Sequence, residues 1–240
     1  SFLIAAEGVL SAAQVGYYRE IRRDTEERWF FVKRTTSTAL CAAAFLQMTG
    51  VGLIVTLLPG RVMSLSQSMV WVGAITSAFA VPFVLFQLPV GRLGDRYGFK
   101  PFIAAGFALA CVVGPLYAMA GSVFGILAGR ALQGLAEIPA WAVAPALLSL
   151  LYPDEKGAAI GRYNASFHLG LTAGSVASVF APAALGGDGI FLLYSATGLA
   201  AAAIVAIFVE EPARALPRTG ALPACRDVLA PPRAARSSAV

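Results

Sequence analysis

GRLGDRYGFKP, residues 91–101, is the stretch of this sequence that decides the fold. It is short, charged and rich in glycine, and it separates two apolar runs, residues 69–90 and 101–121. Each run has about the ~20 residues that a helix needs to cross the ~30 Å hydrocarbon core of a bilayer. We interpret the stretch as a hairpin loop that holds two membrane helices side by side and antiparallel. Gly91 and Gly94 would allow neighbouring helices to approach closely, and Gly98 would allow the sharp reversal.

The composition also indicates a membrane protein. Of the 240 residues, 58% are hydrophobic and 13% are charged, whereas an ordinary soluble domain has about 25% charged residues. The apolar runs are continuous rather than alternating, which favours helices over a β-barrel. We therefore predict an all-α integral membrane protein, a six-transmembrane-helix bundle with spans at residues 38–59, 69–91, 101–121, 122–151, 160–185 and 189–209.

The basic residues are divided unequally between the two sides of these spans. Sixteen of the 18 Lys and Arg residues would lie on one side, while Arg61 lies on the other and Arg130 lies inside a span. By the positive-inside rule, the basic side is cytoplasmic. We predict that both ends of the six-helix unit are cytoplasmic and that the membrane is a bacterial inner membrane. The same asymmetry explains the net charge of +5, so we expect no nucleic-acid partner.

The two ends of the chain differ from the six-span region, residues 36–211. Within residues 1–35, the first 18 are mostly apolar, and the rest alternate acids and bases at helical spacing, as in a juxtamembrane helix. Residues 1–18 are either the last part of an upstream membrane helix or an amphipathic segment on the cytoplasmic face. Residues 212–240 are rich in Pro, Arg and Ala and predict a disordered cytoplasmic tail.

The fourth span contains the residues that are most costly to place in a membrane. A central arginine costs on the order of 2.5–3.5 kcal/mol on insertion scales, so Arg130 and Glu137 need compensation. Spacings of three and four gather the polar residues of this span on one helical face: Arg130, Gln133, Gly134, Glu137 and Trp141. We expect this face to line a polar cavity, or alternatively to lock neighbouring helices together. Arg130 and Glu137 would lie ~10 Å apart along the axis, too far for a direct bridge but suited to a relay or to separate partners.

The sequence has little that an enzyme or a metalloprotein would need. The three cysteines, Cys41, Cys111 and Cys225, form no pairing motif, and His168 is the one histidine in the sequence. No paired carboxylates, metal-ligand cluster or nucleophile with a base lies in or near a span. We predict no catalytic site, no metal site and no cofactor.

Several motifs make the chain resemble the major facilitator superfamily of secondary transporters. The pattern G-x-L-x-D-R-x-G-x-K at residues 91–100 resembles the loop between helices 2 and 3 of that family, and RALQG at residues 130–134 resembles its fourth-helix motif. LQMTGVGLIVTLLP at residues 46–59 and the G-x-x-x-G of Gly170 and Gly174 are similar to motifs of its drug:proton antiporter branch, although Ser175 replaces a proline. The resemblance covers residues 36–211.

This resemblance implies roles for particular residues. The family's fourth-helix arginine is implicated in proton coupling or charge relay, and this role would fall to Arg130. The implied cavity or proton-coupling group is Arg130, Glu137, Gln133, Gln47 and Trp141. The implied cytoplasmic gate is Gly91, Asp95, Arg96, Gly98 and Lys100. The small residues Gly170 and Gly174 would pack the fifth helix closely against a neighbour.

Members of the family generally have two six-helix halves, with the substrate held between them. Six helices would supply one wall of that cavity, so we expect this chain to be the N-terminal half of a small-solute transporter that works by proton-coupled efflux. The second half would be a missing segment, a partner chain or a second copy. The remaining partners would be the lipid bilayer, a small-molecule substrate and protons. The alternative is a non-transporting membrane sensor or assembly factor that reuses the fold.

Overall fold

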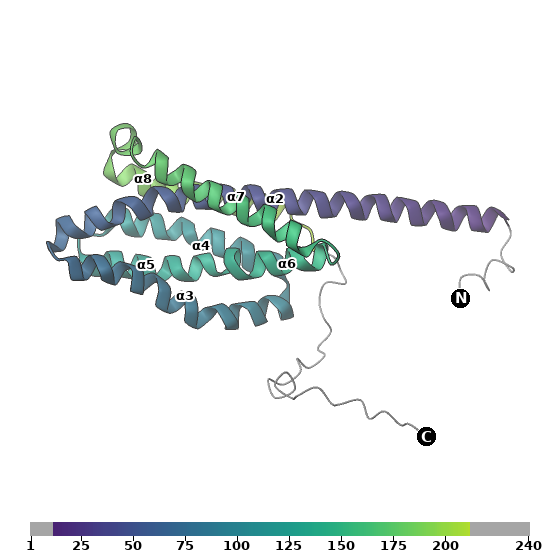
Figure 1. Cartoon of the computed structure of the whole chain (residues 1–240), viewed down its shortest axis with the longest axis horizontal. Helices are drawn as coiled ribbons and strands as arrows, with labels where there is room; N and C mark the ends of the chain where they lie inside the picture. The colour runs from purple at the N-terminus through teal and green to yellow at the C-terminus, as the bar shows by residue number, and fades with distance from the viewer. Residues whose placement is uncertain (1–11, 212–240) are drawn as a thin grey trace, which may run out of the picture.

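The protein is described here by a computed structural model that covers residues 12–211, and all of its regular elements in that range are helices (Figure 1). In chain order they are α2 (Ala12–Ser66), α3 (Met69–Tyr97), α4 (Phe99–Met119), α5 (Val123–Ile138), the π-helical η1 (Pro139–Val143), α6 (Ala144–Leu151), α7 (Lys156–Ala177) and α8 (Ala181–Phe208). The predicted all-α membrane fold is thereby confirmed. The predicted tail, residues 212–240, and residues 1–11 lie outside the described part.

Five helices among the described residues are long and apolar enough to cross a membrane. They are Glu27–Ser66, Met69–Tyr97, Phe99–Met119, Val123–Leu151 and Asp188–Phe208. The remaining predicted span, the fifth (residues 160–185), differs in two respects. Its helix, α7, ends at Ala177, and residues 181–185 already belong to α8. It is also more polar than the other five, since it includes Arg162, Asn164 and His168.

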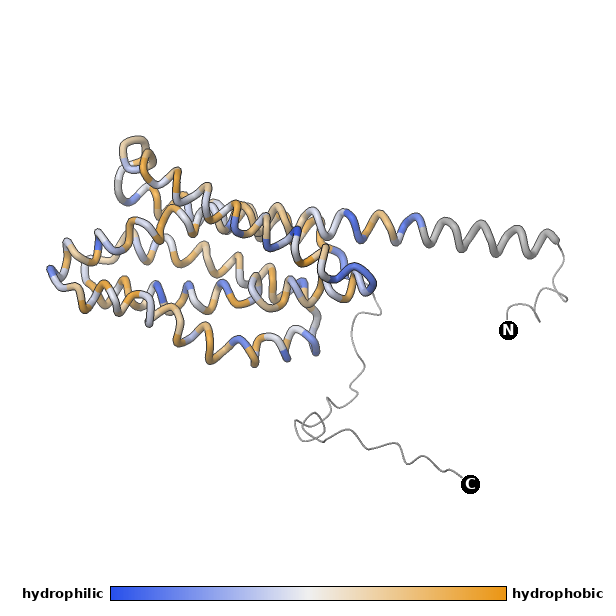
Figure 2. Tube along the Cα trace, viewed as in Figure 1, coloured by the Kyte–Doolittle hydropathy of each residue, from blue (hydrophilic) through white to orange (hydrophobic). Residues whose placement is uncertain are grey.

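Helix α2 is much longer than a membrane span. Its 55 residues extend for ~80 Å at 1.5 Å per residue, and its N-terminal part projects beyond the bundle (Figure 1). Where α2 leaves the bundle, the tube in Figure 2 has blue segments, which mark hydrophilic residues. The sequence predicted a boundary between residues 35 and 36, but the helix continues through this position without a break.

The helices pack in a chain of neighbours that departs from the expected hairpin. Helix α3 packs chiefly against α5, α5 against α4, α4 against α8, and α8 against α2, which packs against α7. The prediction that α3 and α4 lie side by side is therefore wrong. Helix α3 continues to Tyr97, and Gly98 alone, with φ of 103°, turns the chain into α4. Glycine adopts this positive φ without the steric penalty of a β-carbon, and α5 packs where α4 was expected.

The fourth span is one rod made of α5, η1 and α6. The sequence places prolines at positions 139 and 145, and the rod has a π-helical turn that begins at Pro139. Proline has no N–H to donate, so the helix is locally widened rather than broken. Helix α8 has a comparable irregularity at Gly186, where φ is 70°.

The basic connections lie at one end of the bundle. Helix α2 enters there, the α3–α4 turn and the α6–α7 connection lie there, and α8 ends there (Figures 1 and 2). At the opposite end, Arg61 of α2 and Asp188 of α8 form an ion pair at 3.3 Å. The helices thus alternate in direction as the span assignment requires.

Candidate functional site

Helix α5 carries a chain of polar side chains that are buried among apolar helices. The exposed fractions are 8% for Arg130, 0% for Gln133 and 4% for Glu137. The three residues follow one another at spacings of three and four, so their side chains stack along one face of the helix. A charged group buried in this way must be compensated by specific partners.

Gln133 is the link between the two charged groups. Its Oε1 accepts hydrogen bonds from Nη1 of Arg130 at 3.0 Å and from the Tyr117 hydroxyl at 2.7 Å. Its Nε2 donates to Oε1 of Glu137 at 2.8 Å. Because a guanidinium can only donate, the amide oxygen must face Arg130, which settles the orientation of the amide. The amide therefore joins a cation and an anion that, among the described residues, form no direct ion pair.

Arg130 is also held by α3. Its Nε donates to the main-chain carbonyl of Ile75 at 3.3 Å, and its guanidinium lies 5.1 Å from the centre of the Phe79 ring. Arginine has five N–H donors, and two of them make hydrogen bonds among the described residues. The guanidinium is thus buried and oriented, with donors left for a further acceptor.

Trp141 lies between Glu137 and the surface of the chain. Its Nε1 donates to Oε2 of Glu137 at 3.4 Å, and its side chain is 43% exposed. The indole packs edge-on against two phenylalanine rings. The distance between ring centres is 4.4 Å to Phe167 of α7 and 6.2 Å to Phe83 of α3. The polar chain of Arg130, Gln133, Glu137 and Trp141 therefore reaches the surface of the described chain at Trp141, between α3 and α7.

Gln47 is not hydrogen bonded to this polar chain. Gln47 lies on α2 and is buried, with its Oε1 close to Gly198 of α8. Within the described residues, neither its amide oxygen nor its amide nitrogen has a hydrogen-bond partner, and the nearby hydroxyl of Tyr194 has none. The prediction that groups Gln47 with the α5 residues therefore has no contact that supports it.

The residues predicted as a gate lie in the last turns of α3, at the Gly98 turn and at the start of α4. Asp95 and Arg96 are exposed, and the Arg96 guanidinium lies 5.2 Å from the centre of the neighbouring Tyr97 ring. Gly94 is buried beside Val143 of η1. For Gly91, a side chain would meet no atom of the described residues within 4 Å, so its predicted role in close helix packing within this chain is wrong.

Glu211, just after α8, is a partner of this region that the sequence did not suggest. Its carboxylate accepts a hydrogen bond from the main-chain N–H of Lys100, in the first turn of α4, and lies against Gly98. One residue earlier, the main-chain N–H of Glu210 donates to the Thr36 hydroxyl at 3.1 Å. The end of α8 is therefore attached to both α2 and α4, and a carboxylate at a helix N-terminus is electrostatically favourable.

Gly170 and Gly174 lie where α7 touches α2. A β-carbon at Gly174 would be 2.0 Å from the Thr49 carbonyl oxygen, and one at Gly170 would be 2.3 Å from that of Phe45. Only glycine permits so close an approach of two helix backbones.

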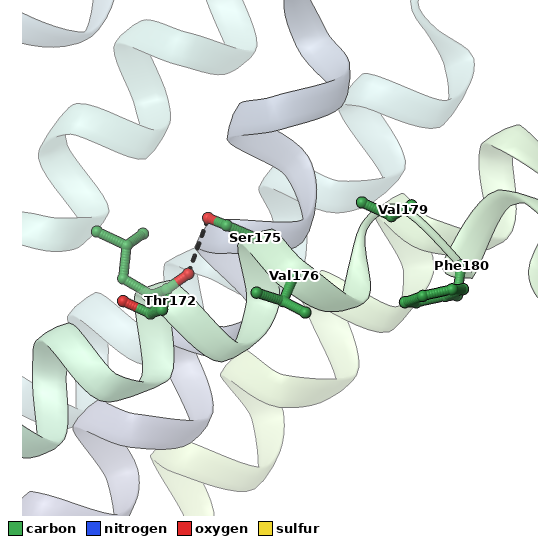
Figure 3. A pocket seen from close by; sticks show the side chains of 6 residues that line it. Thr172, Ser175, Val176, Val179 and Phe180 are labelled. Atoms are coloured by element: carbon green, nitrogen blue, oxygen red, sulfur yellow. Dashed lines mark hydrogen bonds between the residues drawn. The ribbon is translucent and has the colours of Figure 1, made fainter.

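Near the end of α7, an open apolar hollow is lined by Thr172, Val176 and Phe180 (Figure 3). The Ser175 hydroxyl there donates to the Leu171 carbonyl at 2.9 Å, so it is satisfied within its own helix.

Tyr117 and Glu211 are the site residues that sequence reasoning missed. Tyr117 lies in the apolar run of α4, where an isolated phenol has no spacing signal. Glu211 is one of a pair of acids after the last span, which reads as ordinary solvated charge. Each contact joins elements that are distant along the chain, and no local pattern encodes it.

Comparisons with known proteins identify the family of the chain. The model of the Major Facilitator Superfamily matches residues 40–239. The Arabidopsis thaliana protein "Probable anion transporter 3, chloroplastic" is 32% identical over 200 residues, which are 81% of this chain and 38% of that protein. The Drosophila melanogaster protein "Putative inorganic phosphate cotransporter" is 30% identical over 149 residues, 58% of this chain and 28% of that protein. In Escherichia coli, the inner membrane transport protein YajR is 32% identical over 120 residues, 50% of this chain and 25% of that protein.

A solved structure shows the same fold. The human organic anion transporter MFSD10 matches with a TM-score of 0.63 and 19% identity, over 75% of this chain and 48% of that chain. The chain thus spans less than half the length of these relatives. Two of the three curated relatives carry the names of anion or phosphate transporters, so the predicted drug:proton antiporter branch gains no support from them.

Proposed function

The chain belongs to the Major Facilitator Superfamily, and from that premise we propose that it is one six-helix half of a secondary transporter that moves a small anion across a membrane. The predicted small-solute substrate is narrowed here to an anion. The observation that carries the proposal is the buried Arg130, whose guanidinium is linked to Glu137 through Gln133. The names of two relatives, an anion transporter and a phosphate cotransporter, support a negatively charged substrate.

The chemistry of Arg130 suits a small oxyanion. A guanidinium presents its donors in a planar fork that matches a phosphate or carboxylate group. The contacts with Gln133 and the Ile75 carbonyl hold its orientation and use two donors. The remaining donors would bind the anion once it passes Trp141. In an environment of low dielectric constant, this interaction is much stronger than in water.

Glu137 would couple the anion to a proton. An anion on Arg130 neutralises the guanidinium and leaves the carboxylate of Glu137 as an uncompensated buried charge. Such a charge is costly, so anion binding favours proton binding to Glu137, and the converse follows by linkage. An anion and a proton then move in the same direction. The sequence-based prediction of proton-coupled efflux differs in having the proton move against the solute, and the direction of proton flow separates the two.

The substrate cavity would need a second six-helix half. Trp141 and the polar chain open between α3 and α7, where this half alone leaves the tryptophan 43% exposed. A second bundle against this face would close the cavity, as in alternating access between two halves. This second half is a proposed partner, whether it is a further part of the same protein or another chain.

The test is transport by the assembled transporter in liposomes. Uptake of labelled inorganic phosphate is measured with the outside more acidic than the inside, while a trapped pH dye records proton entry. We expect phosphate and protons to enter together. Glu137→Gln should abolish accumulation driven by the pH gradient, because the amide cannot take up a proton. Glu155→Gln is the matched control, since Glu155 is an exposed carboxylate outside the polar chain.

Other outcomes would change the proposal in defined ways. Proton exit during solute entry would favour antiport, as the sequence predicted. Equal accumulation of phosphate in the Glu137→Gln and Glu155→Gln variants would show that Glu137 does not couple the anion to the proton. Saturable anion binding without any flux would favour the non-transporting sensor.

A further inference from the structure

A groove on the outer surface of the bundle, away from the polar chain, has the features of a lipid site. It lies between the basic end of α2 and the last turns of α8, with a volume of about 550 Å³. Its walls include Phe31, Arg34 and Thr38 from α2 and Ile204 and Phe208 from α8. We propose that this groove binds one acidic phospholipid of the leaflet on the basic side, with its phosphate on Arg34 and an acyl chain between α2 and α8.

The groove faces away from the site of the proposed second half. The polar chain opens between α3 and α7, where Trp141 contacts Phe83 and Phe167. The groove is bounded instead by α2 and α8, and α8 packs against α4 and α2. None of the residues that contact Trp141 lines it. A partner that covers the Trp141 face would therefore leave this groove exposed to lipid.

Arg34 is placed for a phosphate headgroup. It is exposed, it lines the groove, and among the residues whose side chains are described it has no ion-pair partner. Lys33, the preceding residue, faces another way, since its ammonium lies over the rings of Trp29 and Tyr152. An arginine with free donors at a membrane interface is a recognised means of holding a lipid phosphate.

The length of the groove along α2 suits the glycerol and acyl parts of the lipid. Thr38 and Ala42 follow Arg34 by one and two turns, so the lined surface continues for ~12 Å along α2. Ala42 leaves open space, and the exposed side chains of Phe31 and Phe208 are apolar walls. A glycerol backbone would lie near Thr38, and the first methylenes of an acyl chain would cover Ala42 and Phe208.

Charge favours an acidic lipid over a neutral one. Exposed basic side chains lie at this end of the bundle, including Arg28 of α2 and Arg92 and Arg96 in the last turns of α3. The acids that end α8 do not line the groove, and Glu211 is bound to the N-terminus of α4. Phosphatidylglycerol should therefore bind more tightly than phosphatidylcholine with the same acyl chains.

The test is native mass spectrometry of the delipidated full chain, titrated with dioleoylphosphatidylglycerol or dioleoylphosphatidylcholine. We expect one high-affinity phosphatidylglycerol. Arg34→Gln should weaken it ~5-fold, the effect of one basic residue near an anionic lipid surface, and leave phosphatidylcholine unchanged. Arg28→Gln is the matched control with the same loss of charge outside the groove, and it should retain the affinity. Ala42→Trp should weaken both lipids by filling the groove, and a monodisperse elution profile checks its fold.

Several results would overturn the proposal. Equal weakening by Arg34→Gln and Arg28→Gln would mean general surface attraction rather than a site. Equal affinity of the two lipids would show that the groove does not select an acidic phospholipid. Displacement of phosphatidylglycerol by inorganic phosphate alone would show that the site binds phosphate rather than a lipid. A two-copy species that Ala42→Trp abolishes would assign the groove to a second copy of this chain.

Discussion

Two buried glutamines should respond in opposite ways to the same substitution. Gln133 and Gln47 are both almost completely buried, with exposed fractions of 0% and 1%. Gln133 makes three hydrogen bonds, with Tyr117, Arg130 and Glu137. Gln47 makes no hydrogen bond of normal geometry within the described residues, although its amide lies near the Tyr194 hydroxyl. Leucine has a similar volume and no polar atoms, so replacing each glutamine by leucine isolates the contribution of its amide.

The magnitudes follow from the hydrogen bonds that are lost. Side-chain hydrogen bonds in membrane proteins average about 0.6 kcal/mol each, so three bonds give a lower figure of ~2 kcal/mol for Gln133→Leu. A buried group left unsatisfied costs about 1–3 kcal/mol, so three such groups give an upper figure of ~9 kcal/mol. Gln47→Leu removes an amide that is buried without a partner, which itself costs about 1–3 kcal/mol. It should therefore leave stability unchanged or raise it.

Thermal unfolding in detergent micelles can be followed with a thiol-reactive fluorescent dye. Cys41 of α2 and Cys111 of α4 are free and half-buried, so their labelling reports the opening of the bundle. Cys225 lies outside the described residues and is replaced by serine in all variants. We expect Gln133→Leu to lower the unfolding temperature by several degrees, and Gln47→Leu to keep or raise it. Equal losses would show that the Gln47 amide is hydrogen bonded, and no loss for Gln133→Leu would refute the polar chain.

The remaining predictions use the same unfolding measurement. Gly174→Ala should destabilise the α2–α7 contact by about 1–3 kcal/mol through overpacking, while Gly157→Ala, in the same helix with no atom near its β-position, should be neutral or stabilising. A small effect at both positions would mean that the two helices separate at little cost. Glu211→Ala should cost ~1 kcal/mol by removing the carboxylate at the N-terminus of α4, while Glu210→Ala should cost less. Equal effects of these two would show that the contact of Glu211 with α4 contributes nothing.

Local periodicity predicted the polar face of α5 but not its partners. Spacings of three and four residues place the side chains of Arg130, Gln133 and Glu137 in reach of one another on any α-helix, and the hydrogen bonds join them in that order. The hydroxyl of Tyr117 and the carbonyl of Ile75 come from α4 and α3. Their positions depend on how whole helices pack, which a local pattern does not contain.

The α3–α4 connection shows where reading a motif as a loop was wrong. The sequence GRLGDRYGFKP has charges and glycines that are typical of a loop, yet most of it is the end of α3. Hydrogen bonding continues the helix wherever the backbone can adopt it, and only the left-handed Gly98 ends it. Any of the glycines in this stretch could adopt a positive φ, and the sequence does not show which of them does so.

By itself, the sequence determined that this chain is helical and belongs in a membrane, because long apolar runs have no other way to satisfy their backbone groups in hydrocarbon. It also determined which charged residues must be buried, since Arg130 and Glu137 lie within such a run. Only the tertiary structure decided the order in which the helices pack and the attachment of Glu211 to α4. These depend on contacts between side chains and backbones far apart in sequence, whose energies are settled only when all the helices pack together.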